Sequence, residues 1–178
     1  PTDVKLLWDC CEFLEDFYRD LYQCVKLKKG KHSFENQKKK QRTYNLLRRK
    51  SRKKTRRRRS QLLKLLARLK SLIDPILERF GPLLNLSEKR IERYKTAQQI
   101  MSQQRFLHEN PSGKLPDRIV SLYKPYIRPI VRGKENKSVE FGVKVHMMQV
   151  DGINIVEHYS YDAYNECKRV KPAIELHK

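Results

Sequence analysis

The sequence has 178 residues and a formal net charge of +21 at pH 7, from 41 Lys and Arg against 20 Asp and Glu. No apolar run approaches the roughly 20 residues that a membrane-spanning helix needs, which argues against a membrane protein. The four cysteines form no CxxC pair and the five histidines share no ligand spacing, so the sequence predicts no metal-binding residues.

Residues 1–25 have the pattern of an amphipathic helix that packs in a core. Their apolar side chains recur at alternating spacings of four and three, which places them on one stripe of a helix. The stripe consists of Leu7, Cys11, Leu14, Tyr18, Leu21 and Val25. Thr2 or Asp3 is expected to cap the start of this helix.

The segment Lys26–Lys70 is the most basic part of the chain, with 21 Lys or Arg residues and one acid, Glu35. Its first part, residues 26–40, lacks periodicity and is predicted to be a loop or a frayed helix. A long helix is expected over residues 43–77, with Pro75 bending or ending its last turn. An apolar stripe occurs only in the later half of that helix, at Leu62, Leu66, Leu69, Ile73, Ile76 and Phe80.

A charge block of this density has three physical interpretations: a disordered arm, a solvated helix face, or a surface that binds nucleic acid. Like charges recur four residues apart, and each such pair destabilises a helix by about 0.2–0.5 kcal/mol, so bound phosphates would stabilise it. Arginine forks also match pairs of phosphate oxygens. We therefore expect DNA contacts from the block and from two later basic residues: Lys38, Lys39, Lys40, Arg42, Arg48, Arg49, Lys50, Arg52, Lys53, Lys54, Arg56, Arg57, Arg58, Arg59, Arg132 and Lys134.

A third helix is predicted from Ser87, a good capping residue, to Phe106. Its apolar face is expected to include Ile91, Tyr94, Met101 and Phe106. Residues 109–116 have the composition of a loop. We place a domain boundary there, between a helical, strongly basic region (residues 1–115) and a region of strands (residues 116–178).

The pattern beyond that boundary changes from helix to strand. Asp117–Tyr123 is a short strand candidate, and Lys124–Lys137 reads as an extended connection. Val139–Val150 then alternates apolar and polar residues, which predicts a strand with one buried face. That core face is expected to carry Phe141, Val143, Val145 and Met147.

Asp151 and Gly152 form a strong two-residue signal for a hairpin turn. The partner strand is predicted over residues 153–159. The chain is expected to become helical again from about Asp162, with an interruption at Pro172.

Four stretches of the sequence resemble bacterial insertion-sequence transposases of the DDE class: Pro1–Trp8, Arg128–Lys134, Glu140–Val145 and Tyr161–Glu166. Members of that family have an RNase H-like catalytic core. The resemblance implies an α+β fold, in which two to three long helices form a basic insertion and a partial antiparallel sheet is followed by a helix. The middle of the chain matches the family only as a helical, basic insertion.

The family cleaves and joins DNA strands with Mg²⁺ ions held by an Asp-Asp-Glu triad, because carboxylates hold the metals that clamp the attacking and leaving oxygens. When the family's pattern is carried over onto this sequence, the first Asp is expected before Pro1, and the second Asp and the Glu are expected after Lys178. The resemblance therefore implies an internal part of a transposase, with no catalytic residue and no cofactor bound by this chain. Asp3 and Asp162 are expected to be helix caps, and Asp151 a turn residue.

The resemblance also implies a partner, an assembly and a location. The partner is double-stranded DNA at the ends of the mobile element, and the full-length protein forms a homo-oligomer. The location is the bacterial cytoplasm, in association with the nucleoid.

Two other functions stay open from the sequence. The first is a non-enzymatic RNA- or DNA-binding protein that uses the same basic block, although the predicted sheet lacks the aromatic stacking pattern of RNA-recognition modules. The second is a helical interaction protein in which the basic block only increases solubility. Binding to duplex DNA at low salt separates the second from the others.

Overall fold

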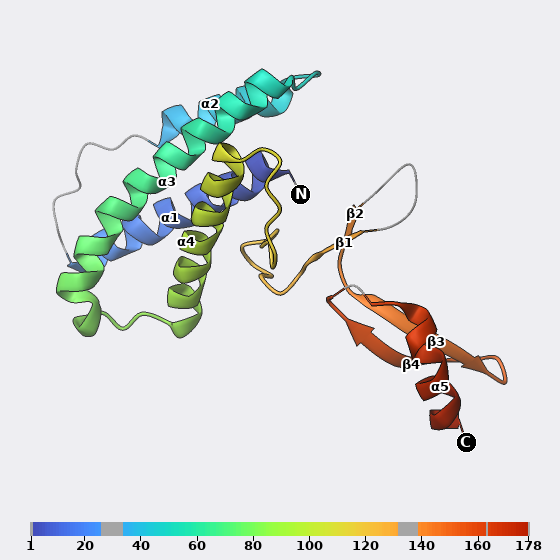
Figure 1. Ribbon diagram of the computed structural model, residues 1–178. Coiled ribbons are helices and arrows are strands. Elements are labelled where there is room, and N and C mark those ends of the chain that lie inside the picture. The colour runs from blue at the N-terminus through green and yellow to red at the C-terminus, as the bar shows by residue number, and fades with distance from the viewer. Residues whose placement is uncertain (1, 26–33, 132–138, 163, 178) are drawn as a thin grey trace. The chain divides into compact units, whose positions relative to one another are not determined.

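The computed structural model describes residues 2–25, 34–131, 139–162 and 164–177, and these form helices and two small antiparallel sheets (Figure 1). The fold is thus a mixture of helix and sheet, with a helical N-terminal part followed by strands and a C-terminal helix, as predicted. The chain divides into two compact units, Pro1–Pro116 and Asp117–Lys178.

The first helix, α1 (Asp3–Val25), confirms the predicted amphipathic segment. The hydroxyl of Thr2 accepts a hydrogen bond from the backbone N–H of Lys5 at 3.3 Å, so Thr2 caps the helix. Phe17 and Leu21 are fully buried, and the predicted stripe faces the core up to Leu21.

The predicted single helix through the basic block is wrong, because the chain forms two helices there: α2 (Glu35–Leu46) and α3 (Arg52–Phe80). Ser51 ends the connection between them, since its hydroxyl caps α3 by accepting from the N–H of Lys54 at 3.3 Å. The hydroxyls of Tyr44 and Thr55 are hydrogen-bonded at 3.0 Å, so the end of α2 lies beside the start of α3.

Residues 26–40 were expected to form a loop or a frayed helix, and their last part is helical, because α2 begins at Glu35. Phe34, just before α2, is buried and stacks on Trp8 of α1 with 5.4 Å between ring centroids. This apolar contact supports a helix that sequence periodicity alone does not reveal. Residues 26–33 lie outside the described residues.

The later half of α3 packs against α1 through the predicted leucine stripe, and Leu62, Leu66, Leu69 and Ile73 are fully buried. Pro75, which was expected to bend or end the last turn, does not end the helix. It is exposed, and α3 continues to Phe80, where Gly81 and Pro82 follow. The break therefore comes at the Gly-Pro pair.

The fourth helix, α4 (Glu88–Glu109), packs against both α1 and α3. Its buried residues are Tyr94, Ala97, Ile100 and Gln104, spaced three or four apart. Ile91 and Phe106, which were predicted to face the core, are instead exposed. Tyr94 donates a hydrogen bond to Asp74 of α3, which joins the two helices.

The second unit contains two short sheets. Strands β1 (Pro129–Val131) and β2 (Val139–Phe141) pair antiparallel, as do β3 (Lys144–Val150) and β4 (Ile153–Ser160). The Asp151-Gly152 turn is confirmed, with positive φ values of 50° and 82° that favour a tight hairpin.

Two strand predictions fail in this unit. The fully described segment Asp117–Tyr123 is not a strand, and Asp117 has a φ of 51° that is incompatible with extended backbone. The predicted core face of β3 is the exposed one, because Met147 is 60% exposed and Val145 is 40% exposed. The opposite face, with Lys144 and His146, is the more buried one.

The reversed burial follows from what packs beside β3. The ammonium of Lys144 donates to the backbone carbonyl of Tyr164 at 2.6 Å, and the rings of His158 and Tyr164 lie 5.0 Å apart. A 3-10 turn, η2 (Glu166–Arg169), and helix α5 (Val170–His177) follow. Pro172 lies in the first turn of α5 and does not interrupt it. The N–H groups of the first turn have no partner within a helix, so a proline there removes no helical hydrogen bond.

Candidate nucleic-acid interface

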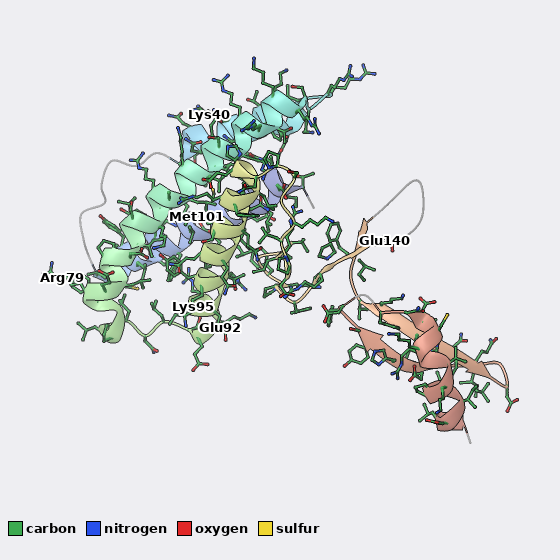
Figure 2. The ribbon with its side chains drawn as sticks, viewed as in Figure 1. Lys40, Arg79, Glu92, Lys95, Met101 and Glu140 are labelled. Carbon is green, nitrogen blue, oxygen red and sulfur yellow. The ribbon has the colours of Figure 1, made fainter. Side chains whose placement is uncertain are left out.

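Helix α2, the turn Leu47–Lys50 and the first turns of α3 form a basic hairpin, which we define as residues 35–61. Most of the predicted DNA contacts in it are exposed: Lys38, Lys39, Lys40, Arg42, Arg48, Arg49, Lys50, Arg52, Lys53, Lys54, Arg56 and Arg57. Figure 2 shows nitrogen-tipped side chains projecting from this end of the helical unit, around Lys40. The one acid, Glu35, pairs with Lys38 at 3.0 Å.

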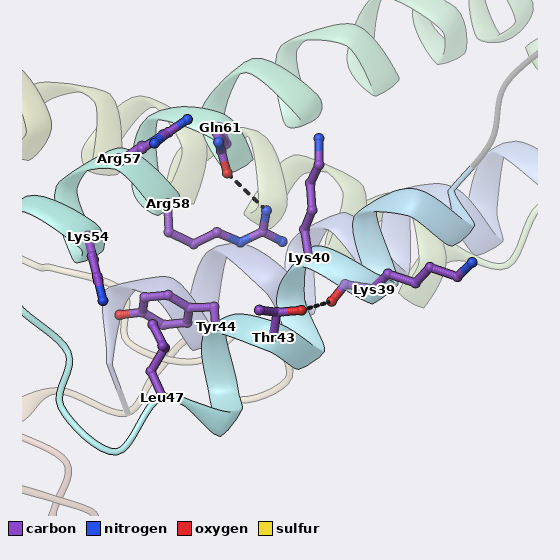
Figure 3. Close-up of a pocket in the computed structure, with 9 residues that line it drawn as sticks. All are labelled: Lys39, Lys40, Thr43, Tyr44, Leu47, Lys54, Arg57, Arg58 and Gln61. Carbon is purple, nitrogen blue, oxygen red and sulfur yellow. Dashed lines mark hydrogen bonds between the residues drawn. The ribbon is translucent and has the colours of Figure 1, made fainter.

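Arg58 is the exception among the predicted contacts, because it is only 4% exposed. Its Nε donates to Gln41 Oε1 at 2.9 Å and its Nη2 to the carbonyl of Gln37 at 3.4 Å. Its Nη1 donates to Gln61 Oε1 at 3.3 Å (Figure 3). Burial lowers the pKa of Arg58. The guanidinium also lies over the Trp8 ring, 5.9 Å from its centroid. Arg58 therefore holds α1, α2 and α3 together, and we remove it from the expected phosphate contacts.

Arg59 is partly occupied by its own chain. Its Nη1 lies 3.6 Å from Asp3 Oδ2, and its Nη2 donates to Gln104 Oε1 at 3.4 Å. Gln104 in turn donates to Asp3 Oδ1 at 3.2 Å, which closes a small network between α1, α3 and α4. Asp3 therefore has a tertiary role, whereas the sequence predicted only a helix cap.

A groove of about 370 Å³ lies between α2 and α3. Figure 3 shows the residues that line it: Lys39, Lys40, Thr43, Tyr44, Leu47, Lys54, Arg57, Arg58 and Gln61. The described lining residues include no acid. Cations come from both helices, while Tyr44 and Leu47 supply apolar surface, so the groove can attract an anion and accept a flat apolar group.

The remaining predicted site residues differ in status. Arg132 and Lys134 lie outside the described residues. Asp162 does not cap the next helix, because the side chain of Asn165 accepts from the N–H of Cys167 at 3.0 Å and takes that role. Within the described part of the chain, no group of three or more His, Cys, Asp or Glu side chains could hold a metal ion.

Comparison with known proteins found no matching family model, no matching curated protein and no matching solved structure. None of the helices that the structure describes is long and apolar enough to cross a bilayer.

Sequence reasoning missed the glutamines that hold Arg58 and Arg59, and the position of His108. Gln41 and Gln104 are almost fully buried, yet an amide side chain in a polar helix gives no sign of burial in the sequence. His108 near the end of α4 lies close enough to Arg59 and Arg56 for their charges to act on it. Only the tertiary fold brings these residues together.

Proposed function

We propose that this chain is the DNA-binding part of a DDE-type transposase and that the basic hairpin is its contact surface for duplex DNA. The observation that carries the proposal is the exposure of cationic side chains along two adjacent antiparallel helices, where the single acid, Glu35, is already paired. The stretches that resemble insertion-sequence transposases support the family and the kind of partner.

The hairpin would act by neutralising phosphates. Residues Arg52–Arg57 rise along about 8 Å of α3, at ~1.5 Å per residue, and lysines of α2 line the other side of the groove. Such contacts give affinity and position on the duplex, and they carry little sequence information. Target choice then belongs to other parts of the transposase.

Strand cleavage requires more than this surface. In the family, Mg²⁺ held by three acids supplies that chemistry, and we expect those acids outside this chain. This chain alone would bind DNA without cutting it. We place its activity in the bacterial cytoplasm, with the nucleoid, and expect the full-length protein to act as a homo-oligomer.

The test is a titration of a dye-labelled DNA duplex, followed by anisotropy, between 50 and 200 mM salt. About 6–10 phosphate contacts predict a loss of roughly 10³–10⁵ in affinity over that range. Absence of binding at 50 mM salt would contradict the proposal and favour a basic block that only increases solubility.

A second candidate function, binding of single-stranded RNA or DNA without catalysis, is favoured by Tyr44. Its ring lies in a groove lined by cations, a combination that single-strand binders use to stack bases beside a neutralised backbone. Tighter binding to a single strand than to a duplex of the same length, together with weaker binding by Tyr44→Ala, would support this function over the first.

A further inference from the structure

A second cavity, of about 730 Å³, lies between the start of α3 and the end of α4. Six ionisable residues line it: Lys50, Arg52, Lys53, Arg56, Arg59 and His108. The residues that line it include no Asp or Glu. Five permanent cations that face one space repel each other, so an anion in the cavity would stabilise the arrangement.

Two nitrogen atoms in this lining are buried without a hydrogen-bond partner among the described residues: Arg59 Nε and His108 Nδ1. Buried polar side-chain atoms in folded proteins are mostly hydrogen-bonded, so such a pair in the lining of one cavity calls for an explanation. An oxygen-bearing anion supplies several acceptors at once. The other nitrogens of Arg59 are held by Asp3 and Gln104, which fixes the side chain in place.

We propose that this cavity seats one phosphate group of bound DNA, which accepts hydrogen bonds from Arg59 and His108 and is paired with Arg56. The inference rests on the proposed function and names one defined phosphate position within it. A phosphate suits the cavity because its oxygens accept several N–H groups at the same time. The groove beside Tyr44 differs from this cavity, because its lining combines cations with apolar side chains.

Phosphate binding is then linked to the charge of His108. In the free protein, burial and the neighbouring Arg59 and Arg56 lower the pKa of His108, while Glu109 opposes them. A bound anion favours the imidazolium form and raises the pKa, so binding takes up a proton in the pH range between the pKa of the free protein and that of the bound protein. The charged groups around the ring are Lys50 from the turn, Arg52, Lys53, Arg56 and Arg59 from α3, Glu109 from α4, and Asp3 from α1 through Arg59.

The test follows the His108 ring by NMR in the full chain during titrations with inorganic phosphate and with duplex DNA. We expect both probes to raise the His108 pKa by about one unit, a tenfold change in proton affinity. Titrations with duplexes that carry or lack a 5′ phosphate show which phosphate of the DNA occupies the cavity. An effect of both duplexes indicates an internal phosphodiester, and an effect of the phosphorylated duplex alone indicates a terminal phosphate.

Arg56→Gln and Arg57→Gln form a matched pair, because both residues are exposed neighbours on α3 and both changes remove one charge. Arg56 lines this cavity and Arg57 lines the other groove. We expect Arg56→Gln to abolish the phosphate effect on His108 and Arg57→Gln to keep it. Equal effects of the two variants would overturn the inference, since they would indicate only a general change in charge.

Failure of the inference and failure of the proposed function give different results. Wild-type protein that binds duplex while neither probe shifts His108 overturns the inference alone. Protein that binds no duplex, but whose His108 responds to inorganic phosphate, overturns the proposed function and the assignment of the phosphate to DNA.

Discussion

The Nε of Arg58 donates to the amide oxygen of Gln41 at 2.9 Å, and each of these side chains is only 4% exposed. A fully charged guanidinium is thus buried between α2 and α3 with neutral acceptors. A buried charge with incomplete hydrogen bonding is destabilising, so the position of the basic hairpin depends on this small set of amide contacts.

We expect Arg58→Met to lower the free energy of unfolding by about 1–3 kcal/mol, because it leaves the Gln41 oxygen buried without its donor. The matched control is Arg57→Met on the exposed side of the same helix, for which we expect a change within about 0.5 kcal/mol. Urea unfolding of both variants measures the difference. Equal stabilities would show that the buried hydrogen bonds contribute nothing.

The double variant Lys54→Gln/Arg57→Gln removes two cations that line the groove between α2 and α3. If each contacts a phosphate, the slope of log affinity against log salt falls by about 2. Arg79→Gln is the control for one charge, because Arg79 is exposed at the far end of α3 (Figure 2). A slope that depends on total charge alone would change with Arg79→Gln as well.

The pH dependence of the second unit is expected to involve Glu157. Hydrogen bonds from Arg169, together with the charges of Arg169 and His146, lower its pKa from 4.5 in spite of partial desolvation. Because the folded pKa is below the unfolded value, the stabilisation is present above about pH 4.5 and is lost as pH falls through the folded pKa. His146 Nδ1 lies 3.0 Å from Glu157 Oε2.

Glu157→Gln removes this carboxylate while it keeps the side-chain size. We expect thermal unfolding of the variant to vary less between pH 5 and pH 3 than that of the wild-type chain. The control is Glu175→Gln, whose residue is exposed on α5. Unchanged acid sensitivity in Glu157→Gln would place the titrating group elsewhere.

One face of the β3–β4 hairpin is apolar and exposed, with Val145, Met147, Val156 and Tyr159 at its centre. An open apolar sheet face and unpaired strand edges favour association with other chains. Met147→Lys is therefore expected to decrease concentration-dependent association, measured by light scattering. The control is Gln149→Lys, which adds the same charge to the same strand without loss of an apolar side chain. If Gln149→Lys decreases association as much as Met147→Lys does, the added charge alone explains the decrease.

The spacing of apolar residues predicted α1 and the later half of α3 correctly, because each of these helices buries a single continuous stripe. The stripe of α1 and the leucines of α3 pack on each other, so the local pattern and the tertiary contact agree. The Asp151-Gly152 turn could also be predicted from the sequence, because the positive φ values that it needs depend on these two residues alone.

The failures have a shared physical cause, which is that local patterns do not show what covers a surface. Alternation in β3 located a strand but not its buried face, because residues 164–169 cover the side with His146. The buried state of Arg58 depends on Gln41 and Gln61, and a run of basic residues looks the same whether or not one of them points inward. The Ser51 cap was visible in principle, since Ser precedes a helix-forming run.

The stacked pair of Trp8 and Phe34 provides an optical consequence. Trp8 is the only tryptophan of the sequence, and it lies against both the residue before α2 and the Arg58 guanidinium. Intrinsic emission of its indole therefore reports the docking of α2 on α1 without a label. A red shift on mild heating, before helix content falls, would reveal that α2 detaches while the rest of the helical unit stays folded.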